Sequence, residues 1–156
     1  MLLYAAFEHE GAAKTLVHHL KYRGVTVYAE VVADALESRV PALPLVPVPR
    51  AWSRRIRYGV DPANAIATAL GRRIGVPVVP VLRPRLHTRR RAGDDHSRPV
   101  PDFSVRELGD PEVVVVDDVV TTGATIVAAA CGLGRHRVRM AVAANVVSTV
   151  SSLSVQ

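Results

Sequence analysis

The sequence predicts an α/β fold with a central, mostly parallel sheet flanked by helices. Two observations favour this class. From residue 45 onward, short runs of β-branched residues alternate with helical patterns, as in right-handed strand–helix–strand units. In addition, residues 113–116 are four consecutive valines, and a strand that is apolar on both faces is typical of the centre of a parallel sheet.

The N-terminal part predicts two helices. In residues 11–22, apolar side chains recur at every fourth position, and Gly24 follows the last turn. Residues 28–40 also place apolar side chains on one helix face, and Pro41 prevents that helix from continuing.

Strands and helices alternate in the rest of the chain. A β-branched run over residues 45–49 predicts a strand. Asp61 and Pro62 are typical of an N-cap and a first helical turn, so we expect a helix that continues to Ile74 and ends at Gly75. The remaining expected elements are strands over residues 76–82, 113–116 and 138–147 and a helix over residues 122–133.

Length and composition exclude several classes of protein. The 156 residues correspond to one domain, which we expect over residues 1–147, with a frayed tail over residues 148–156. Hydrophobic residues make up 49% of the chain and charged residues 22%, which excludes a disordered protein. No apolar run approaches the roughly 18 residues of a membrane span, so we expect a cytoplasmic protein without a membrane partner. The sole cysteine, Cys131, excludes an internal disulfide and is expected to be a small buried residue in a helix.

The charge balance suggests an anionic partner. The net charge is +6, and all but two of the 20 basic residues are arginines. Guanidinium groups bind phosphate and carboxylate oxygens in a planar, two-pronged way. Nucleic acid, a phosphorylated metabolite and an acidic membrane surface all fit this charge. A genome of high GC content, which favours arginine codons over lysine codons, is the alternative explanation.

Residues 113–125 carry the strongest functional signal. The valine run ends in Asp117 and Asp118, and a short loop of small and hydroxyl residues leads into the next expected helix. Ligands of parallel α/β sheets bind beyond the carboxyl ends of the strands, where backbone N–H groups and a helix N-terminus can hold a phosphate. Three threonine hydroxyls add donors, and Gly123 lets the main chain approach the anion closely.

Two carboxylates beside a phosphate site require a ligand that serves both. A ribose 5-phosphate does so, because its hydroxyls donate to Asp117 and Asp118 while its phosphate occupies the loop. Mg²⁺ bound to the same sugar would reduce the repulsion between the carboxylates. The alternative is an acidic pair that only caps the helix, which leaves the threonine-rich loop unexplained.

This stretch resembles the phosphoribosyl pyrophosphate (PRPP) motif of the type I phosphoribosyltransferases, an apolar strand followed by Asp-Asp, two residues and Thr-Thr-Gly-x-Thr. The resemblance implies that fold, with a small hood and a flexible loop, and an enzyme that uses Mg²⁺. It implies that Asp117 and Asp118 are the catalytic residues and bind the ribose hydroxyls. The residues implied around the 5-phosphate are Thr121, Thr122, Gly123, Ala124 and Thr125. Hypoxanthine-guanine enzymes of the family have an aspartate where this chain has Thr121, which argues against that subgroup.

Weaker motifs in the same order resemble the ComF/GntX group of that family, over about residues 14–147. They are Leu20-Lys21-Tyr22-Arg23-Gly24, Val46-Pro47-Val48-Pro49, Arg57-Tyr58-Gly59 and Leu82-Arg83 with Thr88. The chain departs from the group in three ways. It lacks the four cysteines of the N-terminal zinc ribbon, it has arginines where a glutamine usually follows Thr88, and it has Gly59-Val60-Asp61 in place of Gly-Phe-Asn.

The resemblance also implies roles for the arginine-rich segments. Arg50, Ala51 and Trp52 follow the strand that precedes the pyrophosphate loop in the family, so they are the candidates for binding the leaving group. The long polar segment from Arg83 to Pro101 is expected to be the flexible loop that closes over the substrate. Its candidate residues are Arg83, Thr88, Arg89 and Arg90. The alternatives are a solvated basic loop around Arg50 and a nucleic-acid contact at the polar segment.

These residues together predict a phosphoribosyltransferase. It would bind PRPP with Mg²⁺, transfer the phosphoribosyl group to a nitrogen acceptor such as a nucleobase, and release pyrophosphate. The alternative is a protein without catalytic activity, either a ComF-like accessory factor in DNA uptake that binds single-stranded DNA or a PRPP-sensing regulator. Two copies of a chain this small could pair as a homodimer to complete the site.

Overall fold

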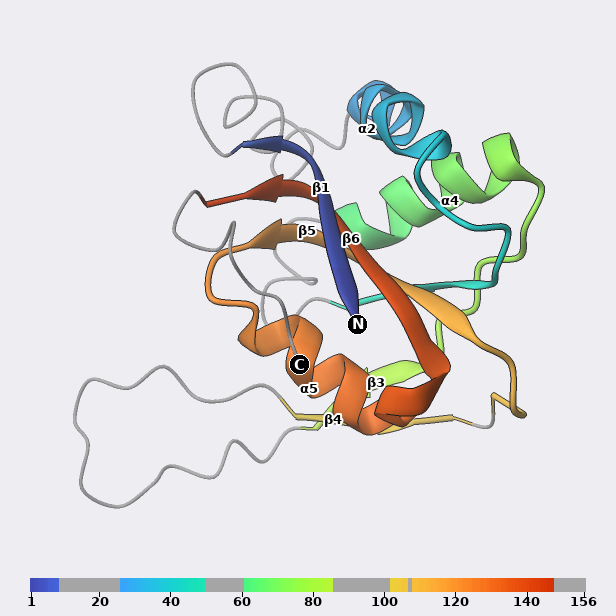
Figure 1. Cartoon of the computed structure of the whole chain (residues 1–156), viewed down its shortest axis with the longest axis vertical. Helices are drawn as coiled ribbons and strands as arrows, with labels where there is room; N and C mark the ends of the chain where they lie inside the picture. Colours follow the sequence, from blue (N-terminus) through green and yellow to red (C-terminus); the bar gives the residue numbers. More distant parts are fainter. Residues whose placement is uncertain (9–25, 50–60, 86–101, 107, 148–156) are drawn as a thin grey trace.

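A four-stranded parallel sheet forms the centre of the molecule (Figure 1). The structure is a computed structural model, and it describes residues 1–8, 26–49, 61–85, 102–106 and 108–147. The sheet order is β1-β6-β5-β2, and every neighbouring pair is parallel. The strands are β1 (Leu2–Glu8), β2 (Leu45–Pro47), β5 (Val113–Val120) and β6 (Val138–Val146).

Helices cover both faces of this sheet. Figure 1 shows α2 (Val27–Glu37) and α4 (Pro62–Ile74) on one side and α5 (Ala124–Leu133) on the other. A short 3-10 helix, η1 (Arg135–Arg137), connects α5 to β6. This arrangement confirms the α/β class with a mostly parallel central sheet flanked by helices.

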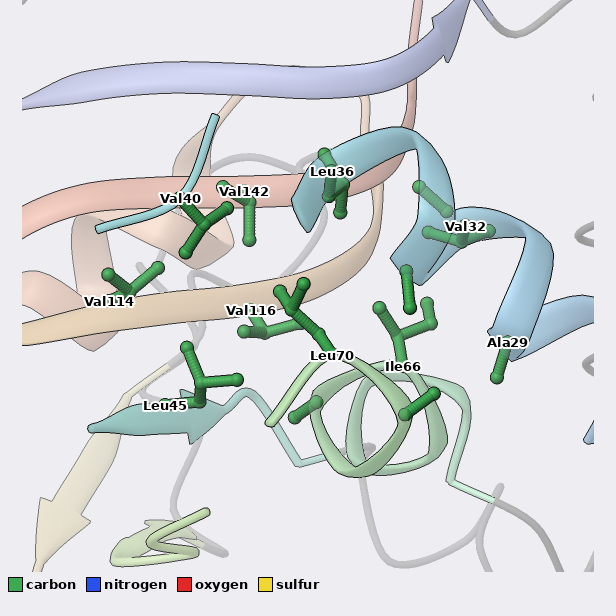
Figure 2. Close-up of a cluster of buried hydrophobic side chains, with 14 of the residues drawn as sticks. Ala29, Val32, Leu36, Val40, Leu45, Ile66, Leu70, Val114, Val116 and Val142 are labelled. Atoms are coloured by element: carbon green, nitrogen blue, oxygen red, sulfur yellow. The ribbon is translucent and has the colours of Figure 1, made fainter. Parts of the chain in front are cut away.

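A cluster of buried aliphatic side chains lies between the sheet and the helices α2 and α4 (Figure 2). Leu36 from α2 and Ile66 and Leu70 from α4 are fully buried with Val114 and Val116 of β5. In a β-strand, successive side chains point to opposite faces, so the neighbouring valines of β5 contribute to the other core. That second core lies beneath α5 and includes Val46, Val115, Ile126, Leu133 and Phe103.

Helix α4 has the predicted ends. Asp61 is the N-cap, and its side chain accepts a hydrogen bond from the Asn64 amide at 3.5 Å. Pro62 occupies the first turn, where a missing N–H costs nothing. Gly75 ends the helix in the left-handed conformation, with φ +71°.

Ion pairs join the exposed surfaces of α2 and α4. Arg72 pairs with Glu30, and Arg73 contacts Glu37 at 2.9 Å and Asp34 at 3.0 Å. The hydrogen bond from Arg73 to Glu37 raises the pKa of Arg73, and partial desolvation opposes this effect. Apolar packing on the buried side and ion pairs on the exposed side therefore hold the two helices together.

The structure differs from the predicted elements between residues 76 and 106. The predicted strand over residues 76–82 is wrong: Val78 forms only an isolated bridge, to Leu45, and only the last residue of the range, Leu82, belongs to a strand. Pro77 and Pro80 flank that bridge and have no N–H to donate to a ladder. Pairing resumes in a separate antiparallel ladder of β3 (Leu82–Pro84) and β4 (Phe103–Val105), of which β4 was not expected.

Other boundaries also differ. The sequence did not predict β1, and β5 continues four residues past the predicted end at residue 116. Helix α2 ends at Glu37 instead of residue 40, α5 begins at Ala124 instead of residue 122, and β2 ends at Pro47 instead of residue 49. The helix predicted over residues 11–22 and the tail over residues 148–156 lie outside the described residues.

Cys131 is exposed, which corrects the expectation that it is buried. It lies on the outer side of α5, and its sulfur accepts a hydrogen bond from the Arg135 side chain at 3.4 Å. Helix α5 is apolar almost all round, so its sequence does not indicate which residues face solvent. None of the helices in the described ranges combines the length and the apolar character that a membrane crossing requires.

Candidate functional site

Asp117 and Asp118 lie near the carboxyl end of β5, at the edge of the sheet where parallel α/β proteins bind ligands. The Asp117 side chain is buried, with 7% of its surface exposed, and Asp118 is half-buried. Both belong to the strand, with Asp117 opposite Ala143 of β6. The sheet therefore places the two acidic residues on a rigid element.

Local hydrogen bonds orient both carboxylates. Oδ1 of Asp117 accepts from the Asp118 amide at 2.8 Å, and Oδ1 of Asp118 accepts from the Val119 amide at 2.8 Å. Each acidic side chain thus bonds to the amide of the residue that follows it. This pattern holds one oxygen of each carboxylate against the backbone in the described state.

The segment after β5 turns sharply into α5. Gly123 is the N-cap of that helix and adopts the left-handed conformation, with φ +75°. This conformation costs an L-residue roughly 1–2 kcal/mol, which explains a glycine here. Gly123 provides no side-chain cap, and the neighbouring contact, from the Ala124 amide to Oγ1 of Thr122, is long at 3.4 Å. The positive end of α5 therefore faces the loop without an acidic cap.

A small hollow lies at this turn. Its cavity volume is about 20 Å³, and its lining comes from the stretch between residues 117 and 126. The lining residues are Asp117, Val119, Val120, Thr121, Thr122, Gly123, Ala124, Thr125 and Ile126. Thr121 and Thr122 are exposed and Thr125 is half-buried, so hydroxyl groups border the hollow together with the buried carboxylate of Asp117. The structure thus gathers the carboxylate of Asp117 and the predicted phosphate loop around one hollow, whereas Asp118 is the next residue of the strand and does not line it.

A larger hollow of about 470 Å³ lies between α2 and α4, but its chemistry is different. Its charged lining includes Glu30 and Arg72, which pair with each other. The opposite charges compensate, so this hollow offers no net charge from that pair to a ligand. We therefore place the candidate site at the carboxyl end of β5.

Of the candidate residues in the predicted arginine-rich segments, the structure describes Arg83 alone. Arg50, Ala51, Trp52, Thr88, Arg89 and Arg90 lie outside the described residues. Arg83, expected in the flexible loop, is instead an exposed residue of strand β3, opposite Ser104 of β4. Its placement in a ladder is a correction, and it follows from the backbone pairing of residues 82–84, which are too few to show a periodic pattern.

The β3–β4 ladder holds together the residues that flank the segment 86–101. The Arg85 amide donates to the Asp102 carbonyl at 3.0 Å, and the two side chains form an exposed ion pair at 3.5 Å. Phe103 of β4 packs in the core beneath α5. Leu82 of β3 packs in the same core, so the described residues on both sides of this segment are anchored beneath the helix that begins at the candidate site.

Sequence reasoning missed one residue at this edge of the sheet. Asn145 of β6 has none of its surface exposed, and it lies opposite Val119 of β5. The signal was present in the sequence, because Asn145 is the lone polar residue in the run from Met140 to Val147.

Among the described residues, no three His, Cys, Asp or Glu side chains gather as a metal site. Asp117 and Asp118 supply carboxylate oxygens, which are the ligands that Mg²⁺ prefers. Mg²⁺ is commonly held by one or two carboxylates together with oxygens of the substrate. The two residues therefore fit a metal that arrives with an oxygen-rich ligand.

The chain is similar to a solved structure, although its sequence gives no match. No protein-family model matches the chain, and no curated protein matches it. Among solved structures, the chain is similar to the purine phosphoribosyltransferase from Pyrococcus horikoshii Ot3, with 19% identity and a TM-score of 0.48. The match covers 81% of this chain and 84% of that one. A similarity at this level carries no conclusion about function.

Proposed function

We propose that this protein is a phosphoribosyltransferase. It binds PRPP together with Mg²⁺ and transfers the phosphoribosyl group to a nitrogen acceptor, a nucleobase or a similar compound. The observation that carries the proposal is the turn after β5, where Asp117, followed by Asp118 on the same strand, borders one hollow together with a threonine-rich loop and a helix N-terminus. This combination suits a ligand that has both sugar hydroxyls and a phosphate.

In this proposal, the two acidic residues bind the ribose. Asp117 and Asp118 accept hydrogen bonds from its vicinal hydroxyls, and these charged acceptors make stronger bonds than neutral ones. The strand fixes both groups before the ligand arrives, which lowers the entropic cost of binding.

The loop from Thr121 to Thr125 binds the 5-phosphate. The exposed hydroxyls of Thr121 and Thr122 and the first amides of α5 are the donors. The left-handed glycine at the N-cap supports the proposal, since it permits the main chain to turn around an anion without a side chain in the way. Mg²⁺ would bind beside Asp117 and Asp118 and supply positive charge that neutralises the pyrophosphate oxygens.

The reaction is a substitution at the anomeric carbon. The acceptor nitrogen forms a bond to this carbon, the bond from the carbon to the pyrophosphate oxygen breaks, and pyrophosphate leaves with the electron pair. The acceptor nitrogen loses its proton to solvent or to a basic group. We assign Arg50, Ala51 and Trp52 to the departing pyrophosphate, because guanidinium and N–H donors stabilise the charge that develops there. Thr88, Arg89 and Arg90 are assigned to a segment that excludes water from the sugar.

Calorimetric titration of PRPP into the protein tests the binding step. We expect binding that requires Mg²⁺ and is lost in the double variant Asp117→Asn and Asp118→Asn. The asparagine side chains retain an acceptor for the amides of Asp118 and Val119, so the fold is kept while both charges are removed. The matched control is Asp34→Asn on the exposed surface of α2, which leaves binding unchanged. Equal affinity in the wild type and the double variant excludes the proposed site.

A second assay separates an enzyme from a sensor. Pyrophosphate release is followed with PRPP, Mg²⁺ and a panel of nucleobases, and we expect release with at least one of them. PRPP binding without release for any acceptor in the panel indicates a PRPP-sensing regulator instead. A DNA-binding accessory protein is distinguished by its affinity for single-stranded DNA, which falls steeply as salt is added.

A further inference from the structure

Two polar side chains are buried in the described part of the chain, and they are neighbours in the sheet. They are Asp117 of β5 and Asn145 of β6. Asp117 pairs with Ala143, and Val119 pairs with Asn145, so the two side chains lie on adjacent strands, two register positions apart. Both are near the carboxyl ends of their strands. Both buried polar side chains of the described residues therefore lie beside the candidate site.

The amide of Asn145 has no partner among the residues that the structure describes. Its Oδ1 and its Nδ2 are both buried, and neither makes a hydrogen bond within the described ranges. A buried amide that loses its bonds to water without replacement destabilises the folded protein. Native proteins rarely keep such groups, and those that remain call for an explanation.

The surroundings of Asn145 favour an apolar residue. Its register partners are Phe7 of β1 and Val119 of β5, and Ala144 precedes it in the strand. Phe7 and Val119 both pack against the core beneath α2 and α4. An apolar side chain of similar size would fit this environment without an unpaired group, so packing alone does not account for the amide.

The hydrogen bonds of the site indicate where the amide would find a partner. In the described state, the Val119 amide donates to Oδ1 of Asp118 at 2.8 Å. A ribose hydroxyl that binds Asp118 competes for this oxygen and weakens the bond from Val119. Asn145 is the register partner of Val119, and adjacent strands lie about 4.8 Å apart, so its side chain can reach that amide.

We propose that Asn145 is a positioning residue of the Asp117–Asp118 site. When the ligand binds Asp118, Oδ1 of Asn145 accepts the hydrogen bond from the Val119 amide and holds the end of β5 in place. The unpaired amide therefore destabilises the free protein, and this loss of stability is recovered when the ligand binds. This inference rests on the proposed function, because it requires a ligand with hydroxyl groups at Asp118.

The test replaces Asn145 with leucine, which has a similar volume and no polar atoms. We expect Asn145→Leu to raise the melting temperature of the free protein, because the unpaired amide is removed. We expect the same variant to weaken Mg²⁺-dependent PRPP binding about tenfold, the factor that one hydrogen bond of ordinary net strength supplies. A purely structural residue does not give these opposite effects.

Two further variants complete the experiment. Val142→Ala, on the same strand, is the control: it opens a cavity and lowers the melting temperature but leaves the affinity for PRPP within about twofold. Asn145→Ala provides the binding measurement if the leucine variant fails to fold. Amide hydrogen exchange at Val119 gives an independent readout: PRPP should leave this amide protected in the wild type, where Asn145 replaces Asp118 as its acceptor, and should speed its exchange in either Asn145 variant.

The outcomes separate the two proposals. If the wild type binds PRPP and the Asn145 variants bind it equally well, the role of Asn145 is overturned and the proposed function stands. If Asn145→Leu lowers the melting temperature, the amide already has a partner in the free protein, and the inference also fails. If the wild type does not bind PRPP, both proposals fall together.

Discussion

Gly123 offers a direct test of the phosphate loop, because the chain contains a matched glycine elsewhere. Gly123 and Gly75 adopt almost the same left-handed conformation, with φ +75° and +71°. Gly123 lines the hollow at the start of α5, whereas Gly75 ends α4, and a Cβ at Gly75 would have open space around it. Alanine at either position therefore introduces the same backbone strain, and only Gly123→Ala introduces it at the candidate site.

The expected loss of stability is fully present where the left-handed conformation is retained, as at Gly75, and it is smaller in Gly123→Ala to the extent that the loop leaves this conformation. The left-handed conformation costs alanine roughly 1–2 kcal/mol, and the reduced entropy of the unfolded chain returns about 0.4–1 kcal/mol. The net loss is about 1 kcal/mol, which lowers the melting temperature of a protein of this size by about 2–4 °C.

The expected effect on binding differs. If the loop around residue 123 relieves the strain by leaving the left-handed conformation, a bound phosphate must restore it at the same cost. That cost of roughly 1–2 kcal/mol weakens PRPP binding about 5- to 30-fold. Gly75→Ala is expected to bind PRPP as the wild type does.

Thermal denaturation and calorimetric titration of the two purified variants measure both effects. A loss of PRPP affinity in Gly123→Ala alone, with a smaller loss of stability than in Gly75→Ala, supports the loop as the phosphate site. The same affinity for PRPP in both variants would refute the reasoning, because the strained conformation would then have no connection with the ligand.

Three further predictions concern stability. Gly71→Ala brings a Cβ within 2.9 Å of the Val76 carbonyl oxygen. The steric cost of about 1–3 kcal/mol exceeds the gain in helix propensity of about 1 kcal/mol. Thermal denaturation should therefore show a less stable protein. At Gly132 the closest contact is 3.3 Å, so alanine there should leave the melting temperature nearly unchanged, and an equal loss in both variants would contradict the steric argument. Asp61→Ala removes the N-cap of α4 and should lower the free energy of unfolding, measured in urea, by about 1 kcal/mol. Asp61→Asn caps equally well and should lower it little. Similar losses in both variants would show that the cap bond is unimportant. Arg73→Gln removes the ion pairs to α2, and its loss of stability should shrink in about 1 M NaCl, while a loss independent of salt would point to packing of the side chain instead.

Local signals in the sequence predicted the elements that depend on local chemistry. The ends of α4 follow from Asp61, Pro62 and Gly75, each of which suits its own backbone position. The four valines of β5 indicate a central strand because burial on both faces requires apolar residues throughout. The continuation of β5 through Asp117 was not predictable in this way, because two acidic residues break the apolar pattern and bond to their own neighbours.

Elements that depend on distant partners were the ones missed. Strand β1 has an apolar sequence without alternation, and its place in the sheet depends on β6. Strands β3 and β4 have three residues each, too few for a periodic pattern, and their pairing joins Leu82 to Val105. Conversely, residues 76–82 contain enough valines to suggest a strand, but the prolines prevent a continuous ladder.

The residues of the candidate site also divide into those that a local motif locates and one that depends on a distant strand. Its carboxylates, threonines and glycine form one continuous segment, so a motif locates them together. Asn145 lies far along the chain from Asp117, and the two meet only because β5 and β6 are neighbours in the sheet. An isolated asparagine in an apolar strand indicates a position of interest, but the sequence does not reveal what lies beside it.

The pairing of β1 with β6 has a consequence for how the protein reaches its native state. Leu2 lies opposite Met140, and Glu8 lies opposite Val146. Because synthesis proceeds from the N-terminus, β1 leaves the ribosome before the other described elements, and its sheet partner β6 follows all of them. An apolar strand must wait with its hydrogen-bonding edge unpaired, which is the state most open to aggregation. The sheet closes only after nearly all of the described chain is available, so slow folding governed by non-local contacts is built into this topology.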